Sequence, residues 1–431
     1  MTGARSGGPS LTDTERGMLD GREGPGVAMA MRVVVAVARV RGAAGLVEIS
    51  GAHIDSCLYH GRAGLDFARR LLDLGARVRV PTTLNVGSLD LVHPGMVRRR
   101  TEHEQEVAEE GRALMDAYVA LGARTTWTCA PYQLDARPAR GEHVAWAESN
   151  AIVFANSVLG ARTDRYGDFL DICAAVTGRA PHAGLHLTGN RRGGLVVDCR
   201  ALGDKALALD LTYPLLGYLV GLRCGAGTNP VLLGLPAGTD EDRLKAFGAA
   251  AASSGGVALF HVVGLTPEAP TLEAALQGGS VPTLTVTSVD LRAARAELST
   301  ARGTRLDAVS LGTPHASLAE IAALADGLRA GAPLDPRVAF YLSTGRSVLE
   351  RARAAGHVEE LERAGVRIVV DTCTYVTSIL DPDDRVVLTT SGKWAHYAPG
   401  NLGVDVVIAS LQECLASARA GEVVLDDGLL G

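Results

Sequence analysis

The feature that most constrains this chain is a regular alternation of short apolar segments with helical segments. In the first part of the chain, the apolar segments lie at 46–50, 77–85 and 124–130, and the helices between them lie at 64–74 and 101–121. The same rhythm returns later, with strands expected at 256–263, 283–286, 308–311, 338–343, 367–371 and 404–409. This alternation predicts an α/β fold built mostly on parallel sheets.

The length and the composition indicate more than one lobe. The chain has 431 residues, of which 47% are hydrophobic and only 4% aromatic, so its cores must consist mainly of Ala, Val and Leu. A single core does not usually extend over so long a chain. We therefore expect several α/β lobes around a central cleft, with a boundary near Leu235 between a lobe at 11–235 and a lobe at 236–431. The polar residues 1–10 are expected to be disordered.

The net charge, the lack of long apolar runs and the dispersed cysteines indicate which partners and which cellular compartment to expect. The formal net charge is −6 and no basic stripe is present, which disfavours nucleic acid as a partner. No apolar run reaches the roughly 20 residues of a membrane span, and the N-terminus lacks the apolar segment of a signal peptide. Seven dispersed cysteines without a CxxC pair argue against disulfides. A cytoplasmic location is therefore expected.

Polar residues gather where the expected strands end, and ligands of α/β sheets bind beyond the carboxyl ends of the strands. Cys57, Cys129 and Cys373 fall at such ends beside hydroxyl or acidic residues. These positions suit ligands of a metal ion or an iron–sulfur cluster, although a lone free cysteine is more often a small buried hydrophobe. Cys173 and Cys414, within apolar helical segments, are expected to be core residues.

The segment 141–169, GEHVAWAESNAIVFANSVLGARTDRYGDF, combines apolar and polar residues at a high density. We expect a buried helix over 144–159 that includes Glu148. Buried polar side chains on such a helix need internal partners. Two interpretations stay open: a hydrogen-bond network between lobes, or a site in which Arg162 and Arg165 hold a carboxylate or a phosphate.

Six runs spread along the chain resemble the aconitase X family. They are HIDSC (53–57), VPTTLN (80–85), TCAPYQ (128–133), the 141–169 segment, DTC (371–373) and TTSGKWAHYAPG (389–400), in collinear order. The start of the chain, LTDTERGMLDGREGPGVAMAMRV, is also similar to the beginning of the family's large subunit. The resemblance covers nearly the whole chain and implies an aconitase-like large subunit.

The resemblance implies an iron-dependent dehydratase, usually with an iron–sulfur cluster. Iron with an open coordination position would help hydroxide to leave while a base takes the acidic α-proton. Cys129 and Cys373 are the expected iron ligands, with Cys57 as the third, because thiolates are the soft ligands that such sites require.

The family motifs also suggest the remaining site residues. The expected catalytic residues are Glu148, His53 and Lys393, with Glu148 as an oxygen ligand or an acid–base group and His53 as a proton shuttle. The expected substrate contacts are Thr83, Asn85, Ser149, Asn150, Asn156, Arg162, Arg165 and Ser391.

The family's two activities leave the substrate open. One dehydrates cis-3-hydroxy-L-proline to Δ1-pyrroline-2-carboxylate, and the other dehydrates mevalonate 5-phosphate. The CAPYQ run, the stretch 170–181 and the HIDSC cysteine are more similar to the bacterial hydroxyproline members. A basic cluster near Arg162 and Arg165 would instead favour the phosphate.

The resemblance also implies a partner. The family's small swivelling domain has no counterpart in the pattern, so we expect a separately encoded small subunit and a heterodimer. A hypothesis of another class is a non-catalytic binding or regulatory subunit that lacks iron. An isomerase that rehydrates its product, as ordinary aconitases do, is a third alternative.

Overall fold

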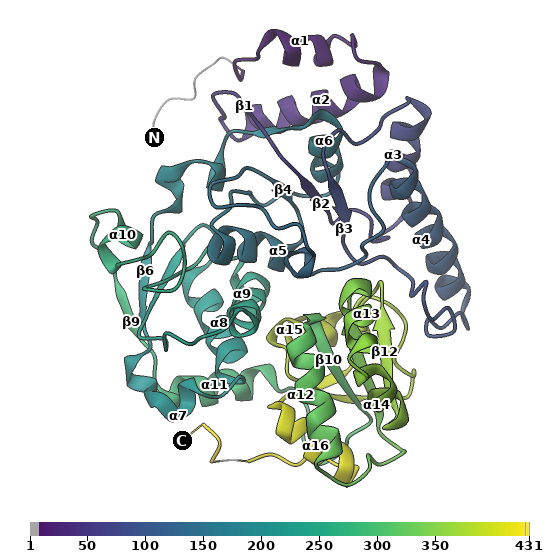
Figure 1. Cartoon of the computed structure of the whole chain (residues 1–431), viewed down its shortest axis with the longest axis vertical. Helices are drawn as coiled ribbons and strands as arrows, with labels where there is room; N and C mark the ends of the chain where they lie inside the picture. Colours follow the sequence, from purple (N-terminus) through teal and green to yellow (C-terminus); the bar gives the residue numbers. More distant parts are fainter. Residues whose placement is uncertain (1–7, 427, 431) are drawn as a thin grey trace.

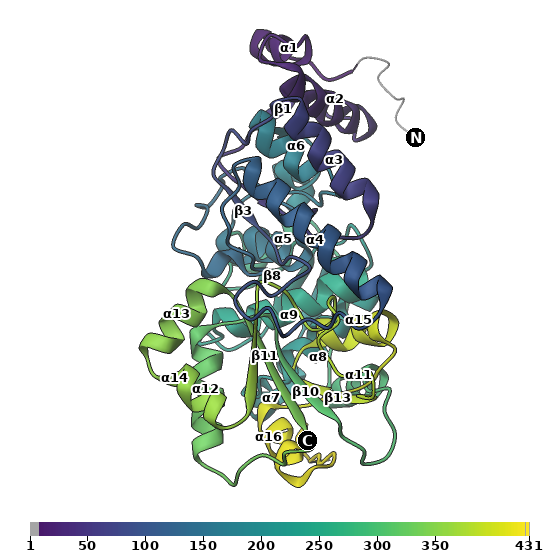
Figure 2. The same cartoon turned by 90° about the vertical axis from the view of Figure 1, so that its right-hand side faces the viewer.

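Three parallel β-sheets, each accompanied by helices, follow one another along the chain. The computed structural model describes residues 8–426 and 428–430. In Figure 1 the N-terminal helices lie at one end of the molecule and the C-terminal sheet at the other, and Figure 2 shows the same long arrangement from the side. The expected α/β architecture with mostly parallel sheets is confirmed.

The first sheet has the strand order β3-β2-β4 and is parallel. Its strands are β2 (Ala52–Ile54), β3 (Thr82–Leu84) and β4 (Ala145–Trp146). The accompanying helices are α1 (Asp13–Leu19), α2 (Pro25–Val40), α3 (Arg62–Asp73), α4 (Glu102–Ala120), α5 (Ser149–Phe154) and α6 (Leu170–Thr177). A short antiparallel pair, β1 (Leu46–Glu48) with β5 (Arg179–Pro181), joins it.

The second sheet has the order β8-β7-β6-β9, and the helices of this part of the chain include a closely packed pair, α8 and α9. Its strands are β6 (Leu195–Asp198), β7 (Pro230–Leu233), β8 (His261–Val262) and β9 (Thr283–Thr285). Its helices are α7 (Gly203–Leu207), α8 (Thr212–Cys224), α9 (Glu241–Gly255), α10 (Leu272–Leu276) and α11 (Ser288–Leu298). The pair requires Gly221, where a Cβ would lie only 2.7 Å from the carbonyl oxygen of Ala251.

The third sheet has the order β12-β11-β10-β13-β14, so the chain reverses direction across the sheet beside β10. Its strands are β10 (Ala308–Ala316), β11 (Ala339–Thr344), β12 (Val366–Val370), β13 (Val386–Thr389) and β14 (Asp405–Ile408). Its helices are α12 (Leu318–Arg329), α13 (Arg346–Ala354), α14 (His357–Arg363), α15 (Gly392–Leu402) and α16 (Leu411–Ala420). The edge between β10 and β13 is a topological switch point, where α/β sheets bind ligands.

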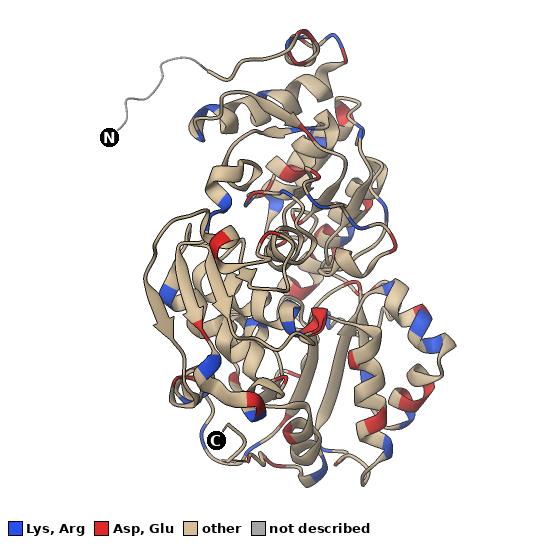
Figure 3. Ribbon diagram, turned by 60° about the vertical axis from the view of Figure 1, so that its left-hand side comes forward, with Lys and Arg blue, Asp and Glu red and all other residues tan. Residues whose placement is uncertain are grey.

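Helix starts follow local capping chemistry. Thr12 with Glu15 forms a capping box at the start of α1, and Ser317 with Glu320 forms another at the start of α12. In each box the hydroxyl accepts from the third helical amide while the carboxylate accepts from the cap residue's own amide. Figure 3 shows that Lys and Arg are interspersed with Asp and Glu along the outer helices, while the strands of the third sheet carry few charges.

Three expectations about local structure were wrong. The expected strand at 124–130 is irregular, with only an isolated bridge from Arg124 to Thr83. The expected helix at 144–159 begins only at Ser149, because the residues before it pair with β2 as strand β4. The apolar and charged pattern over 347–364 also predicts one continuous helix, but the structure interrupts it at Gly356, whose φ of 80° lies in the left-handed region.

Other boundaries need comment. Leu235 falls between β7 and α9, within the residues of the second sheet, and the division expected there stays a prediction. Of the N-terminal segment expected to be disordered, residues 1–7 lie outside the described residues. Within the described ranges, no helix combines the length and the apolar character needed to cross a bilayer.

Candidate active site

The carboxyl ends of the first and third sheets face each other, and buried polar side chains lie between them. Backbone contacts cross this junction: the Gly87 amide donates to the Asp371 carbonyl at 2.7 Å, and the Val370 amide donates to the Asp90 carboxylate at 2.9 Å. The junction therefore collects residues from strand ends that are distant in the sequence.

Cys129, His315 and Cys373 form the cluster at this junction best suited to a metal ion. Their ligand atoms all lie within 4.8 Å of one another, and all three residues are buried. The His315 backbone amide also donates to the Cys129 sulfur at 3.2 Å. Two thiols and an imidazole are donors that iron, copper and zinc accept.

The surroundings of His315 fit a metal ligand. Its Nε2 lies 3.1 Å from the Thr372 carbonyl oxygen, so Nε2 carries the proton and Nδ1 holds the lone pair, 3.0 Å from the Thr128 hydroxyl. A ring nitrogen fixed by a backbone carbonyl is the usual support of a metal-binding imidazole. Burial lowers the pKa of His315 to about 4, which keeps the ring neutral and able to bind a metal.

A buried ion pair between Glu148 and Lys393 lies next to this cluster. Lys393 also lies 3.3 Å from the Ser149 hydroxyl, and the Ala151 amide donates to Glu148 at 2.8 Å. Burial disfavours both charges, but Lys393 and the amide outweigh it and hold the pKa of Glu148 below its ordinary value. Glu148 in turn raises the pKa of Lys393 against the effect of burial. The pair is therefore ionised.

Asn150 connects the ion pair to the cysteine cluster. Its side-chain amide donates to the Cys129 carbonyl oxygen at 2.6 Å and to Glu148, and its oxygen accepts from Tyr132. Because Glu148 caps helix α5, its backbone lies at the start of this helix and its carboxylate points back over the first turn.

His53 and Thr83 are the paired middle residues of β2 and β3, and Asn85 directly follows β3. His53 Nδ1 lies 2.8 Å from the Thr83 hydroxyl, whereas its Nε2 is buried without a hydrogen-bond partner. Burial lowers the pKa of His53 to about 4. The side-chain amide of Asn85 donates to Asp55, while its oxygen is buried and unpartnered.

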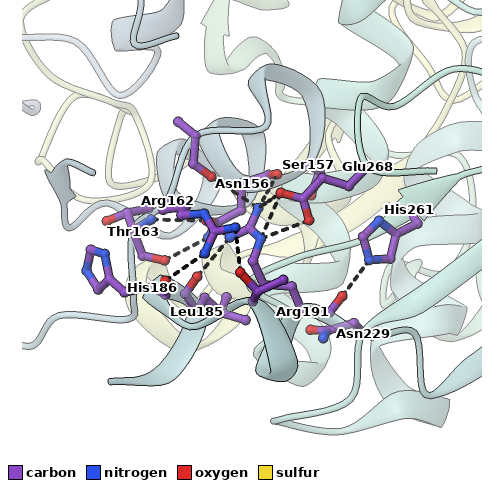
Figure 4. Close-up of polar contacts among 12 residues, drawn as sticks. Asn156, Ser157, Arg162, Thr163, Leu185, His186, Arg191, Asn229, His261 and Glu268 are labelled. Atoms are coloured by element: carbon purple, nitrogen blue, oxygen red, sulfur yellow. Dashed lines mark hydrogen bonds and ion pairs between the residues drawn. The ribbon is translucent and has the colours of Figure 1, made fainter. Parts of the chain in front are cut away.

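Four expected site residues lie in other contacts. Asn156 belongs to a network around Arg191, which Figure 4 shows together with Arg162. Arg162 donates to the His186 carbonyl at 2.8 Å and to Thr188, and Arg165 donates to the Gly256 carbonyl at 3.0 Å. The Ser391 hydroxyl caps helix α15 by accepting from the Trp394 amide, and Ser391 lines a cavity of about 310 Å³ beside the β10–β13 switch point.

The third expected metal ligand, Cys57, is absent from the cluster of ligand atoms, where His315 stands in its place. The Cys57 thiol is buried and lies 3.4 Å from the Ile54 carbonyl oxygen. Sequence reasoning missed His315 because β10 was expected to end at Leu311, although it continues to Ala316. A histidine four residues after the expected strand end was the available signal.

The facing sheet edges and the Cys–His–Cys cluster define an α/β protein with a candidate metal centre. Residues 8–189, 195–297 and 306–420 match the families described as Aconitase X first, second and third domain. The chain belongs to the aconitase X family.

Individual relatives agree with this assignment. Cis-3-hydroxy-L-proline dehydratase of Pseudomonas aeruginosa is 46% identical, over 97% of this chain and 71% of that protein. Phosphomevalonate dehydratase large subunit of Methanothermobacter thermautotrophicus is 38% identical, over 92% of this chain and 96% of that protein. The crystal structure of Thermococcus kodakaraensis aconitase X in its holo-form has a TM-score of 0.84 at 33% identity, covering 95% of this chain and 100% of that one.

Proposed function

We propose that this chain is the catalytic large subunit of an iron-dependent hydro-lyase that converts cis-3-hydroxy-L-proline to Δ1-pyrroline-2-carboxylate. The observation that carries the proposal is the cluster of Cys129, His315 and Cys373 beside the ionised Glu148–Lys393 pair. Relatives at 46% and 42% identity carry the name of this dehydratase.

Cys129, His315 and Cys373 would hold the iron, as a single ion or as part of an iron–sulfur cluster. Bound there, iron would act as a Lewis acid that helps the 3-hydroxyl group to leave. Cys57 lies outside this group of donors, and its buried thiol points to backbone carbonyls.

The ion pair would orient the substrate. An ammonium has three N–H donors, and Lys393 uses two of them on Glu148 and Ser149. The third donor is suited to the substrate carboxylate, whose negative charge grows when the α-proton leaves.

His53 would accept the α-proton. Its neutral ring offers a bare Nε2, because the Thr83 hydroxyl can donate to the Ala52 carbonyl oxygen at 3.3 Å while it accepts from His53 Nδ1. Glu148 lies close enough to influence the pKa of His53 and would stabilise the imidazolium that forms. Glu148 therefore supports the base and need not bind iron itself.

Hydroxyproline is favoured over phosphomevalonate by the charges at the site. A phosphate would need free cations, but Lys393 is already paired, and Arg162 and Arg165 bind backbone carbonyls elsewhere. Arg191 lies near Arg162, but its guanidinium is already bound to Glu268, to Asn156 and to backbone carbonyls, so it is not free for a phosphate. The seven cysteines, all free thiols, suit the reducing cytoplasm in which we place the enzyme.

We also propose a small swivelling subunit as the partner. The relatives named large subunit are covered over nearly their whole length, for example 96% of the Methanothermobacter thermautotrophicus protein, and that name implies a second, small chain. The site is expected to be complete only when this subunit closes over the junction.

Anaerobic co-expression with the small subunit, followed by iron analysis and a dehydration assay on both substrates, tests the proposal. We expect stoichiometric iron and turnover of cis-3-hydroxy-L-proline but not of mevalonate 5-phosphate. The variant Cys173→Ala, at a buried cysteine of helix α6, should keep both iron and activity. Iron-free protein that turns over neither substrate would support a non-catalytic subunit instead, and a hydrated isomer as product would identify an isomerase.

A further inference from the structure

Asp55 and Asn85 lie side by side at the ends of β2 and β3, at the edge that faces the proposed metal centre. The Asn85 side-chain amide donates to Asp55 Oδ1. The opposite atom of the same amide, Asn85 Oδ1, is buried with no partner, and among the described residues Asp55 Oδ2 has no hydrogen-bond donor. Asn85 Oδ1 costs free energy because it is a buried acceptor without a donor, whereas Asp55 is only half-buried. Two adjacent acceptors are therefore available to a ligand.

The charges around Asp55 call for a cation. Its carboxyl lies near Glu148 and Asp171, and the nearby Lys393 is already paired with Glu148. Burial, assisted by the two carboxylates, raises the pKa of Asp55 to about 7. A bound cation would offset all three effects.

The neighbouring Asp171 shows what a purely structural carboxylate looks like here. It accepts from the amides of Asp55 and Ser56, from the Ser56 hydroxyl and from the Ile172 amide. Both of its oxygens are used in fixing the loop after β2. Asp55 accepts only from Asn85 among the described residues, which leaves its Oδ2 available to a ligand.

We propose that Asp55 and Asn85 form a subsite for the secondary ammonium group of the substrate. A ring ammonium carries one positive charge and two N–H donors, which match one carboxylate oxygen and one amide oxygen. This inference rests on the proposed function, because it places the amine of a cyclic β-hydroxy amino acid opposite the carboxylate held by Lys393. It makes Asp55 the residue that distinguishes an amino acid from a hydroxy acid without an amine, such as a phosphorylated one.

Two inert ligands test the subsite directly. L-proline and cyclopentanecarboxylate have the same ring size and carboxylate and differ in the ammonium, and neither has a hydroxyl to eliminate. Calorimetry on the iron-loaded two-chain complex should show L-proline binding at least about tenfold more tightly, the weight of one charge-assisted hydrogen bond. In Asp55→Asn this preference should fall below about threefold, with iron content unchanged.

The matched control is Asp66→Asn, at an exposed carboxylate of helix α3, which should keep the full preference. Equal affinities in the unsubstituted protein, or a preference that survives Asp55→Asn, would overturn the subsite. Because binding is measured without turnover, the result is separate from the proposed reaction. A preference that depends on Asp55, together with no dehydration of cis-3-hydroxy-L-proline, would keep the subsite and reject that substrate.

Steady-state kinetics show whether Asp55 binds the substrate amine or only stabilises the folded protein. With cis-3-hydroxy-L-proline, Asp55→Asn should raise KM by about tenfold and change kcat by less than about threefold. With cis-2-hydroxycyclopentane-1-carboxylate, which lacks the amine, the same substitution should leave kcat/KM unchanged. Equal losses on both compounds would contradict recognition of the amine.

Discussion

Two buried polar clusters in this molecule have opposite hydrogen-bonding states. Around Arg191 the guanidinium donates to Glu268, to Asn156 and to the carbonyls of Leu185 and Ala161, so each of its nitrogens has a partner (Figure 4). At the junction of the first and third sheets, Asn85 Oδ1 and His53 Nε2 are buried without partners.

The difference separates a structural network from a binding site. A saturated network binds segments of the chain to one another, as Arg191 binds helix α5's extension to the loop before β6. Acceptors left empty at the facing sheet edges are where the proposed ligand would supply the missing donors. Unpartnered buried atoms also occur elsewhere, at His261 Nδ1 beside the Arg191 network and at His357 Nδ1 and Glu360 Oε2 on helix α14.

The largest effect is expected at the proposed metal centre. Cys373→Ala should lower dehydration by about 1,000-fold or more, because several kcal/mol of Lewis-acid stabilisation are lost at about 1.4 kcal/mol per factor of ten. Iron content should fall with it, while the urea midpoint of the metal-free protein changes little. Retained iron and activity would remove Cys373 from the centre.

Next in size is the buried ion pair. Lys393→Met should lower the free energy of unfolding by about 4 kcal/mol, because Glu148 is left buried and uncompensated. The double variant Lys393→Met/Glu148→Gln should regain most of this stability in urea unfolding but no activity. If the double variant were as unstable as the single one, the charge argument would be wrong.

At the hydrogen-bonded cluster around Arg191 we expect a loss of stability without a loss of activity. Arg191→Met should cost about 3 kcal/mol of stability, since several buried acceptors lose their donor together. The folded variant should keep kcat within about twofold, measured per correctly folded chain below its unfolding transition. A tenfold loss of kcat in stable protein would mean that this cluster also serves the site.

Acid should destabilise the protein through His53. Its pKa is lowered from 6.5 to about 4, so the unfolded state binds more protons between these pH values and stability falls as the pH falls. At pH 5 the loss relative to pH 7 is about 2 kcal/mol from this group, at about 1.4 kcal/mol per pH unit below 6.5. In urea unfolding, the free energy of unfolding of His53→Asn should fall between pH 7 and pH 5 by about 2 kcal/mol less than that of the unsubstituted protein. An equal fall in both proteins would refute the assignment.

The smallest effect is expected at Arg162. Because its guanidinium contacts the His186 carbonyl and Thr188 rather than the junction, Arg162→Ala should change the KM for hydroxyproline by less than about twofold. Steady-state kinetics with Arg165→Ala as the companion variant would check this. A large rise in KM would show that these arginines bind the substrate carboxylate after all.

The sequence allowed the α/β fold and the strand-end positions to be predicted, because periodicity and glycines are local signals. Glu148 and Lys393 were chosen from motifs 245 residues apart, and the structure pairs them. His315 was missed because β10 was expected to end at Leu311 and because the sequence does not show that the edges of the first and third sheets face each other.

Asn156 shows the opposite error. A regular helix over 144–159 would place Asn156 on the same face as Ser149, seven residues earlier. Instead the helix starts at Ser149 and continues as a π-helix at Ala155–Leu159. The wider turn sends Asn156 to Arg191, and no spacing rule for a regular α-helix predicts that.

The most direct test of the account is iron X-ray absorption on the loaded protein, comparing Cys373→Ala with Cys57→Ala. The account predicts sulfur and imidazole scattering around iron, with the sulfur signal reduced by Cys373→Ala and untouched by Cys57→Ala. A sulfur signal that depends on Cys57, or iron surrounded only by oxygen and nitrogen, would contradict a centre built from Cys129, His315 and Cys373.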